Sequence, residues 1–251
     1  MFLGAGMKDL SVEVYNKHSV AKKGIFRSFF RIIKWVILVF LGSSIFFTLL
    51  YRWLPPPVTP LMLIRLGDQL SEGKDLRLKK DWVSLKKISP NLVQAVIASE
   101  DAEFLEHYGF DFDAIKKAQE YNAKHKRVKG ASTISQQTAK NVFLWPDRSW
   151  IRKGLEVYFT GLIELIWGKE RIMEIYLNVI EMGDGYYGAE AASLHFFNKP
   201  ASQLTKSEAA LIAATLPNPR IFKADQPSEY IKRKQGRILV IMNRSGKVSF
   251  E

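Results

Sequence analysis

The stretch SWIRKGLEVYFTGLIELIWGKERIMEIYLNVI, residues 149–180, decides the fold class. Its apolar side chains recur every three to four residues, which is the spacing of one face of an α-helix. In the first half these residues are Ile151, Leu155, Tyr158, Phe159, Leu162, Ile163 and Ile166. Gly168 divides the stretch, so the pattern predicts one helix from about Ser149 to Trp167 and a second over 169–180. We therefore expect a domain that is mainly α.

Start and stop signals predict further helices on both sides of this stretch. Ser89 is a typical N-cap, and Pro90 suits the first position of a helix that continues through Phe104. Residues 205–208, TKSE, form a capping box, and Pro217 ends the helix that follows. A last helix is expected over about 228–242.

Two segments give weaker signals. Residues 61–88 are expected to form short strands or an irregular lead-in. Residues 118–131, AQEYNAKHKRVKGA, are polar and basic, and we interpret them as a loop.

The N-terminal part contains a candidate membrane span. Residues 35–51, WVILVFLGSSIFFTLLY, carry no charge, and with their flanks they reach the ~20 residues that cross roughly 30 Å of hydrocarbon. The six cations closest before the span are Lys17, Lys22, Lys23, Arg27, Arg31 and Lys34, and only Arg52 follows it closely. This bias predicts a cytoplasmic N-terminus and a C-terminal part on the far side of the membrane.

A buried core helix and a cleaved signal peptide are the alternatives for this segment. The apolar run is long for a signal peptide and lacks a clear cleavage site, which favours an uncleaved anchor. The prolines of residues 55–60, PPPVTP, cannot continue a helix. We therefore predict four parts: a basic N-terminus (1–31), a transmembrane helix (32–54), a proline-rich spacer (55–66) and a catalytic domain (67–251).

Composition narrows the function. The 251 residues are 47% hydrophobic and include no cysteine, which excludes disulfides, zinc–thiolate sites, iron–sulfur clusters and a thiol nucleophile. The net charge of +12 alone would allow nucleic-acid binding. About half of the excess lies in residues 1–54, next to the apolar run, so we expect a membrane neighbour and no nucleic acid.

The first candidate site is ASEDAEFLEHYGFD, residues 98–111. Glu100 follows Val93 and Val96 at helical spacing, and a carboxylate beside a buried stripe is suited to take a proton. The alternatives are a solvated charge at the edge of the helix and a carboxylate that caps a neighbouring backbone. Glu100 and His107 do not have the spacing of metal ligands on one helical face.

The second candidate is KGASTISQQTAKN, residues 129–141. Ser132 and Thr133 are N-cap types, so the amides of the following helix are expected to point at an anion such as phosphate. Gln136, Gln137 and Lys140 follow within two turns, and the basic residues Arg148, Arg152 and Lys153 come soon after. The alternative is a polar surface helix with ordinary capping.

The third candidate is Glu156, four residues after Arg152 on a helical face. It is either half of a surface ion pair or a second carboxylate of the site. In residues 169–197 we expect mostly scaffold, with Asn178 and a glycine turn shaping one wall of the site and His195 as a structural residue.

With these segments in view, the chain resembles glycosyltransferase family 51, the peptidoglycan glycosyltransferases. Five motifs occur in order: EDxxFxxHxG at 100–109, GxSTIxQQxxKN at 130–141, RKxxE at 152–156, KExIxExYLN at 169–178 and GxxGxEAA at 185–192. Residues 208–219, EAALIAATLPNP, also look like the family. Ala131, Ser135 and Thr138 depart mildly from the usual pattern. No Ser-x-x-Lys transpeptidase motif follows, which resembles the monofunctional, membrane-anchored, biosynthetic branch.

The resemblance implies a lysozyme-like helical domain with a small membrane-facing jaw, and an enzyme that polymerises lipid II into β-1,4-linked glycan with release of polyprenyl diphosphate. Glu100 matches the general base and Glu156 the second carboxylate, in a displacement that inverts the anomeric centre. Substrate contacts are expected from Ser132, Thr133, Gln136, Gln137, Lys140, Asn141, Arg148, Arg152 and Lys153. No protein-bound metal is predicted, although assistance by a divalent cation (Mg or Mn) is left open.

The implied location is the bacterial inner membrane, with the catalytic domain in the periplasm. The implied partners are lipid II, the growing glycan, the membrane, and cell-wall synthesis or division proteins. Two other functions remain to be tested. One is a hydrolase that cleaves finished peptidoglycan on a similar scaffold, and the other is a non-catalytic anchored partner of the wall machinery.

Overall fold

The computed structural model describes residues 5–125, 128–147, 149–246 and 248–250, and within the first helix the side chains from Arg27 onward. The chain divides into two compact units, residues 1–47 and 48–251. Helix α1 (Ala5–Trp53) contains the segment Arg27–Trp53, which is 27 residues long, reaches a mean hydropathy of 2.2 in its most apolar part, and is long enough to cross a bilayer. The predicted span at 32–54 corresponds to this segment, whereas the boundaries of the four predicted parts stay predictions.

Ten α-helices and three short strands are found among the described residues, so the prediction of a mainly α fold is confirmed. After α1 the helices are α2 (Pro60–Ser71), α3 (Pro90–Glu100), α4 (Phe112–Lys124), α5 (Ile134–Phe143), α6 (Trp150–Ile166), α7 (Gly168–Val179), α8 (Ala189–Phe197), α9 (Lys206–Thr215) and α10 (Glu229–Arg244). Short 3₁₀ turns, η1 (Leu85–Lys87) and η2 (Ala201–Gln203), lie between them.

The helices begin where the sequence placed their caps. Ser149 accepts a hydrogen bond from the Arg152 amide at the start of α6, and Ser228 caps α10 in the same way. Thr205 and Glu208 form the predicted capping box of α9. Each cap satisfies amides that a helix leaves without a partner in its first turn, which is why these polar residues fix the helix starts.

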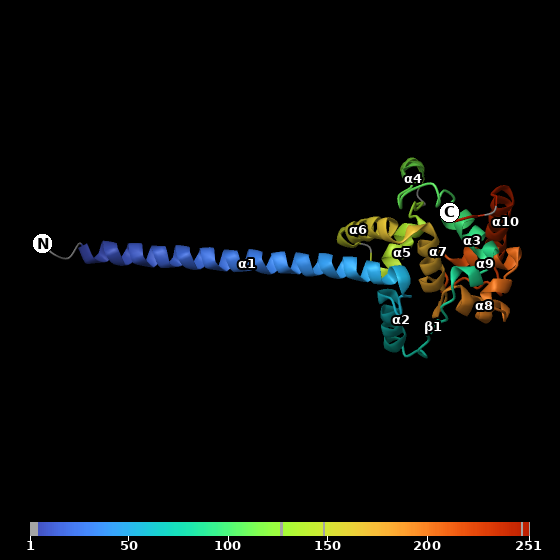
Figure 1. The fold of residues 1–251 in the computed structure, drawn as a ribbon, viewed down its shortest axis with the longest axis horizontal. Helices are drawn as coiled ribbons and strands as arrows, with labels where there is room; N and C mark the ends of the chain where they lie inside the picture. Colours follow the sequence, from blue (N-terminus) through green and yellow to red (C-terminus); the bar gives the residue numbers. More distant parts are fainter. Residues whose placement is uncertain (1–4, 126–127, 148, 247, 251) are drawn as a thin grey trace. The chain divides into compact units, whose positions relative to one another are not determined.

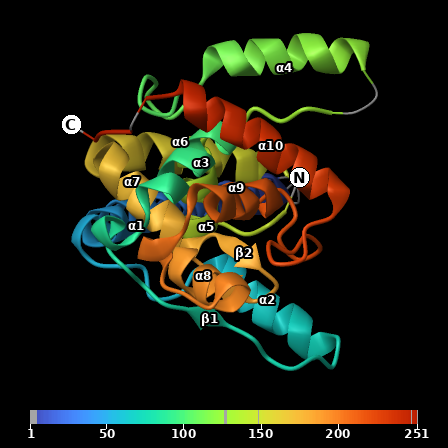
Figure 2. The same ribbon diagram turned by 90° about the vertical axis from the view of Figure 1, so that its right-hand side faces the viewer.

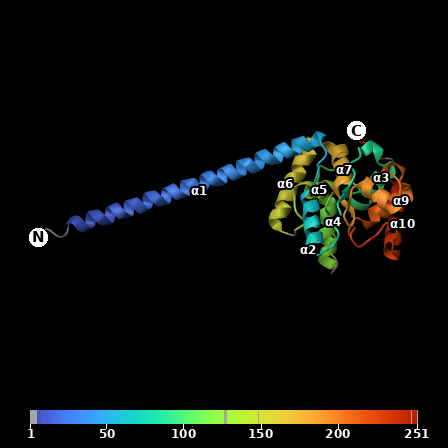
Figure 3. The ribbon, with the colours of Figure 1, turned by 90° about the horizontal axis from the view of Figure 1, so that it is seen from below.

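The domain consists of two helix groups that share one core. Helices α3, α9 and α10 pack together on one side, and α5, α6 and α7 on the other (Figures 1 and 3). Helix α7 is buried along most of its length; its fully buried side chains are Ile172, Met173, Ile175, Tyr176, Leu177, Asn178 and Val179. Helix α5 is therefore held at a fixed position against α6 and α7, and α3 against α9 and α10.

A small sheet lies beside α8. Its strands are β1 (Lys79–Lys80), β3 (Tyr186–Tyr187) and β2 (Glu181–Gly183) in that order, with β1 parallel and β2 antiparallel to β3. Gly185 has φ of +79°, and a Cβ there would lie 2.7 Å from the Arg77 carbonyl oxygen, so only glycine fits this turn.

The end of α1 is fastened to the junction of α6 and α7. The indole Nε1 of Trp167 donates to the Thr48 carbonyl at 2.6 Å, and the Arg171 guanidinium donates to the carbonyls of Tyr51 and Leu54 at 2.8–3.0 Å. The last four carbonyls of a helix have no partner within the helix, and that of Tyr51 is one of them, so Arg171 satisfies a group that α1 leaves open.

Two expectations for local structure were wrong in part, although the short strand β1 and the turn η1 agree with the lead-in predicted over 61–88. Residues 60–71 form helix α2. Thr59 accepts a hydrogen bond from the Met62 amide, and Pro60 occupies the first turn. This start signal was missed because the apolar pattern of the segment is weak. Residues 112–124 form helix α4, capped by Asp111, so the predicted loop at 118–131 is helical up to Lys124. Figure 2 shows α4 at the edge of the domain, where a polar helix remains solvated.

Candidate active site

Glu100 is the last residue of α3, and its half-buried carboxylate accepts two hydrogen bonds. Ser99 Oγ donates to Oε1 and Gln137 Nε2 of α5 donates to Oε2, both at 3.1 Å. Lys234 of α10 lies within electrostatic range of the same carboxylate, and its Nζ donates to the Ala214 carbonyl at 3.3 Å. Burial lowers the pKa of Lys234, and the charge of Glu100 opposes this change.

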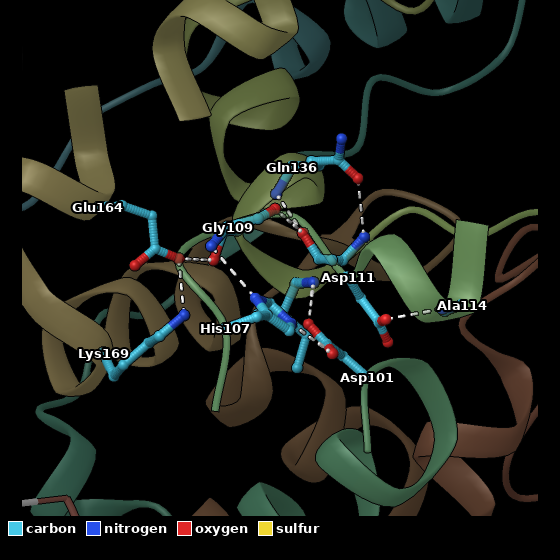
Figure 4. Close-up of polar contacts among 11 residues, drawn as sticks. Asp101, His107, Gly109, Asp111, Ala114, Gln136, Glu164 and Lys169 are labelled. Carbon is cyan, nitrogen blue, oxygen red and sulfur yellow. Dashed lines mark hydrogen bonds and ion pairs between the residues drawn. The ribbon is translucent and has the colours of Figure 1, made fainter. Parts of the chain in front are cut away.

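Asp101 has a different environment although it adjoins Glu100. Its buried carboxylate accepts from His107 Nε2 and from the Ile134 amide, both at 2.9 Å (Figure 4). The Gly109 amide donates to His107 Nδ1 at 3.1 Å, so the ring proton of a neutral His107 lies on Nε2. Asp101 therefore caps the backbone of α5, the alternative considered for this carboxylate pair.

The start of α5 is held by its own capping box. Thr133 Oγ1 accepts from the Gln136 amide at 3.2 Å and donates to the Gly109 carbonyl at 2.7 Å. The Gln137 amide donates to the Thr133 carbonyl at 2.9 Å. The amides of Ile134, Gln136 and Gln137 are thus engaged within the chain, and the expectation that they are open to phosphate is wrong for these three groups.

Next to this cap, the Glu164 carboxylate of α6 binds side chains of α5 and α7. Ser135 Oγ and Lys169 Nζ donate to the same oxygen, Oε1 of Glu164, at 2.5 and 2.7 Å (Figure 4). The Lys169 ammonium also lies 4.6 Å from the centre of the Phe104 ring. Sequence analysis did not single out Glu164 or Lys169. The sequence did contain a sign of this pair, since Glu164 is a charged residue within an apolar helix and Lys169 follows soon after that helix ends.

The second carboxylate, Glu156 of α6, lies in a cluster of cations. Its side chain is 4% exposed; Oε2 pairs with Arg152 Nη1 at 2.5 Å, and Oε1 pairs with Lys153 Nζ. Lys140 of α5 is within electrostatic range of all three side chains, and burial lowers its pKa while the Glu156 charge opposes this. No ion pair of Lys140 is found in the part of the chain that the structure describes.

The charges of this cluster do not balance. Lys140, Arg152 and Lys153 share the single carboxylate of Glu156, and the buried Nε of Arg152 has no hydrogen-bond partner among the described residues. An excess of partly buried positive charge is stabilised when an anion binds to it. The cluster is thus suited to hold a diphosphate.

Helix α5 carries one residue toward each carboxylate. Gln137 contacts Glu100, and Lys140, three residues later, lies near Glu156. Three residues rise about 4.5 Å along a helix and return to a similar face. The packing of α5 against α6 and α7 therefore brings the candidate base and the cation cluster to one helix.

Over residues 67–243 the chain matches the family described as Transglycosylase. That match covers most of the chain. The chain belongs to this transglycosylase family. It is thus an enzyme of glycosyl transfer.

Similar proteins occur in several bacteria under the name "Biosynthetic peptidoglycan transglycosylase". The enzyme is 57% identical to one from Bdellovibrio bacteriovorus over 82% of its length and 84% of that protein. It is 57% identical to one from Bacteroides thetaiotaomicron (83% and 84%), and 49% identical to one from Pseudomonas syringae pv. syringae (86% and 91%).

The other predicted substrate contacts of the enzyme are placed as follows. Ser132 is exposed, and Asn141 is buried with its Nδ2 donating to the Gln137 carbonyl at 2.8 Å. Thr133 and Gln136 are buried in the capping box. Arg148 lies outside the described residues. The roles of all these residues in substrate binding stay predictions.

Two residues assigned to scaffold are also located. The Asn178 amide exchanges hydrogen bonds with the Val83 backbone at 2.9–3.0 Å, so it fastens the segment before η1 and does not shape a wall of the site as expected. His195 stacks on Tyr186 with ring centres 3.7 Å apart, a packing role. Among the described residues, no three His, Asp or Glu side chains gather where they could bind a metal ion.

Proposed function

We propose that this enzyme polymerises lipid II into β-1,4-linked glycan strands of peptidoglycan, with release of polyprenyl diphosphate. The proposal rests on the arrangement along α5. Gln137 on this helix contacts the Glu100 carboxylate, and Lys140, one turn later, lies in a cluster with an excess of positive charge. Glycosyl transfer from a diphosphate donor needs both elements: a base for the acceptor and positive charge for the leaving group.

Glu100 acts as the general base in this proposal. A sugar hydroxyl is a weak acid, so it attacks more readily when a carboxylate takes its proton during bond formation. The acceptor oxygen forms the new bond to the anomeric carbon as the bond from that carbon to the diphosphate oxygen breaks. The attack comes from the face opposite the leaving group and inverts an α-linked donor to a β-linked product.

The leaving diphosphate is stabilised by the cluster around Glu156. Lys140, Arg152 and Lys153 supply positive charge where negative charge develops, and Glu156 holds two of these cations in place. A diphosphate is already a good leaving group, so it needs charge compensation more than a strong acid.

The anchor fits a substrate with a polyprenyl tail. We propose that residues 32–54 span the inner membrane with the N-terminus in the cytoplasm, which leaves the catalytic domain in the periplasm. A domain tethered at the bilayer surface meets a membrane-bound donor at high local concentration.

The test is incubation of the purified full-length enzyme with lipid II. The wild type is expected to form long glycan, and Glu100→Gln to lose about 100-fold or more of this activity while keeping its circular dichroism spectrum. Full activity in folded Glu100→Gln would remove Glu100 as the base. Cleavage of finished peptidoglycan without lipid II would instead support the hydrolase alternative.

A further inference from the structure

A tyrosine from the centre of the core reaches the candidate base through one intermediate side chain. Tyr176 of α7 is fully buried, and its hydroxyl donates to Gln137 Oε1 at 3.2 Å. Gln137 Nε2 in turn donates to Glu100 Oε2 at 3.1 Å. Three helices, α7, α5 and α3, are thus joined by one chain of hydrogen bonds that ends on the carboxylate.

The two ends of this chain define the orientation of the Gln137 amide. If the amide turned over, its oxygen would face the Glu100 carboxylate, and two acceptors would meet without a proton between them. In the observed orientation the amide oxygen has the Tyr176 hydroxyl as donor, so both ends of the amide are satisfied. The half-buried Gln137 side chain is therefore held in one conformation.

Tyr176 remains a donor at every working pH. Burial raises its pKa well above the ordinary value of 10.0, and the charges of Glu100 and Asp101 raise it further. Within the described part of the chain, Lys234 of α10 is a cation in electrostatic range of Glu100. The carboxylate thus has a fixed neutral donor on the α5 side and a cation on the α10 side.

We infer that Tyr176 is a positioning residue for the transfer reaction, acting through Gln137 to hold the Glu100 carboxylate in its reactive orientation. The inference rests on the proposed role of Glu100 as the base. A general base must lie within hydrogen-bond reach of the proton it takes, and small displacements cost rate. Tyr176 does not contact the substrate in this arrangement.

The test removes only the hydroxyl, in Tyr176→Phe of the full-length enzyme. With lipid II as substrate, kcat is expected to fall about tenfold with KM changed less than twofold. The kcat–pH profile is expected to differ from that of the wild type, because the Gln137 amide that donates to Glu100 is no longer held in one orientation. A folded variant with wild-type kcat and a wild-type pH profile would overturn the inference.

Tyr187→Phe is the matched control. Tyr187 is also fully buried, but its hydroxyl has no hydrogen-bond partner among the described residues. Its removal tests the general effect of losing a buried tyrosine hydroxyl, and we expect kcat and the pH profile to stay as in the wild type. An equal loss in both variants would show that Tyr176 acts on the core alone, against the inference.

Gln137→Leu keeps the inference testable if Tyr176→Phe does not fold. It removes the connecting amide and is expected to lower kcat and to change the pH profile as Tyr176→Phe does. Where both single variants fold, the double variant should be no slower than Gln137→Leu, since the two residues act in series. Additive losses, or a Gln137→Leu enzyme with wild-type kcat and profile, would contradict the series arrangement.

A parallel assay of Glu100→Gln separates this inference from the proposed function. If Glu100→Gln retains full turnover, the base assignment fails and the inference fails with it. If Glu100→Gln is inactive while Tyr176→Phe behaves as the wild type, only the role of Tyr176 is wrong.

Discussion

Adjacent carboxylates take different roles because their surroundings differ. Asp101 is 7% exposed, and its two oxygens are bonded to a histidine ring and a helix amide, so it is out of reach of a substrate hydroxyl. Glu100 is half-buried, and its two donors leave lone pairs free, since a carboxylate accepts about four hydrogen bonds. A proton acceptor and a structural clamp can therefore occupy neighbouring positions.

At Lys140 we expect function and stability to oppose each other. Burial lowers the pKa of Lys140 below 10.5 in the folded protein. Between that lowered pKa and 10.5 the unfolded chain binds more protons than the folded protein, so the free energy of unfolding rises with pH in this window. Lys140→Met should thus raise the melting temperature at pH 7, by an amount that shrinks as pH approaches 10.5. Turnover with lipid II should fall about 100-fold. A variant less stable than the wild type at pH 7 would contradict this.

Glu156 is expected to matter for folding as well as for turnover. Glu156→Gln leaves Arg152 and Lys153 without their shared carboxylate, and breaking a buried ion pair from one side costs about 3 kcal/mol or more. Denaturant unfolding measures this loss. The exposed pair Glu229–Lys232 provides the control, since Glu229→Gln breaks an ion pair that stays in water and should change the free energy of unfolding far less than Glu156→Gln.

At the scale of elements, α5 is the organising helix of the site. Its start is fixed by the Thr133–Gln136 capping box and by Asp101, and its turns then carry Gln137 and Lys140. The segment before it is fixed by Gly109, whose carbonyl accepts from Thr133. A shift of the N-terminal end of α5 would therefore move Gln137 and Lys140 together.

Gly109→Ala should therefore destabilise the domain. Its φ is +83°, and an added Cβ would lie 2.7 Å from Thr160 Cγ2, so strain and a clash combine at a cost of about 1–3 kcal/mol. Gly161→Ala in α6 is the matched control, because nothing lies within 4 Å of its added Cβ and alanine favours a helix by up to ~1 kcal/mol. Urea unfolding should thus move in opposite directions for the two variants, and equal shifts would refute the argument.

At the scale of the whole molecule, the segment Arg27–Trp53 explains how the enzyme would be retained at a membrane. Its side chains from residue 27 to 47 are exposed except for Ser44, so the protein itself covers little of this apolar surface. An apolar helix of this length inserts into a bilayer far more firmly than surface charges bind to one.

We expect the protein to remain in the membrane fraction after washes with 1 M salt and with alkaline carbonate, and to be released by detergent. Salt screens the attraction between basic residues and lipid headgroups, whereas it leaves an inserted helix in place. Immunoblots of the washed fractions measure this, and release by salt alone would contradict a membrane-spanning α1.

The sequence by itself determined the helical class, the apolar anchor and most helix starts, because periodicity and capping are local properties. It failed at α2 and α4, where short polar helices are marginal in isolation and packing or a single cap decides. Only the tertiary structure decided the hydrogen bonds that join Glu100 to Gln137 and Gln137 to Tyr176, and the proximity of Lys140 to Glu156. These residues lie 16 to 76 positions apart in the chain, and their distances follow from how α3, α5, α6 and α7 pack, which no local pattern specifies.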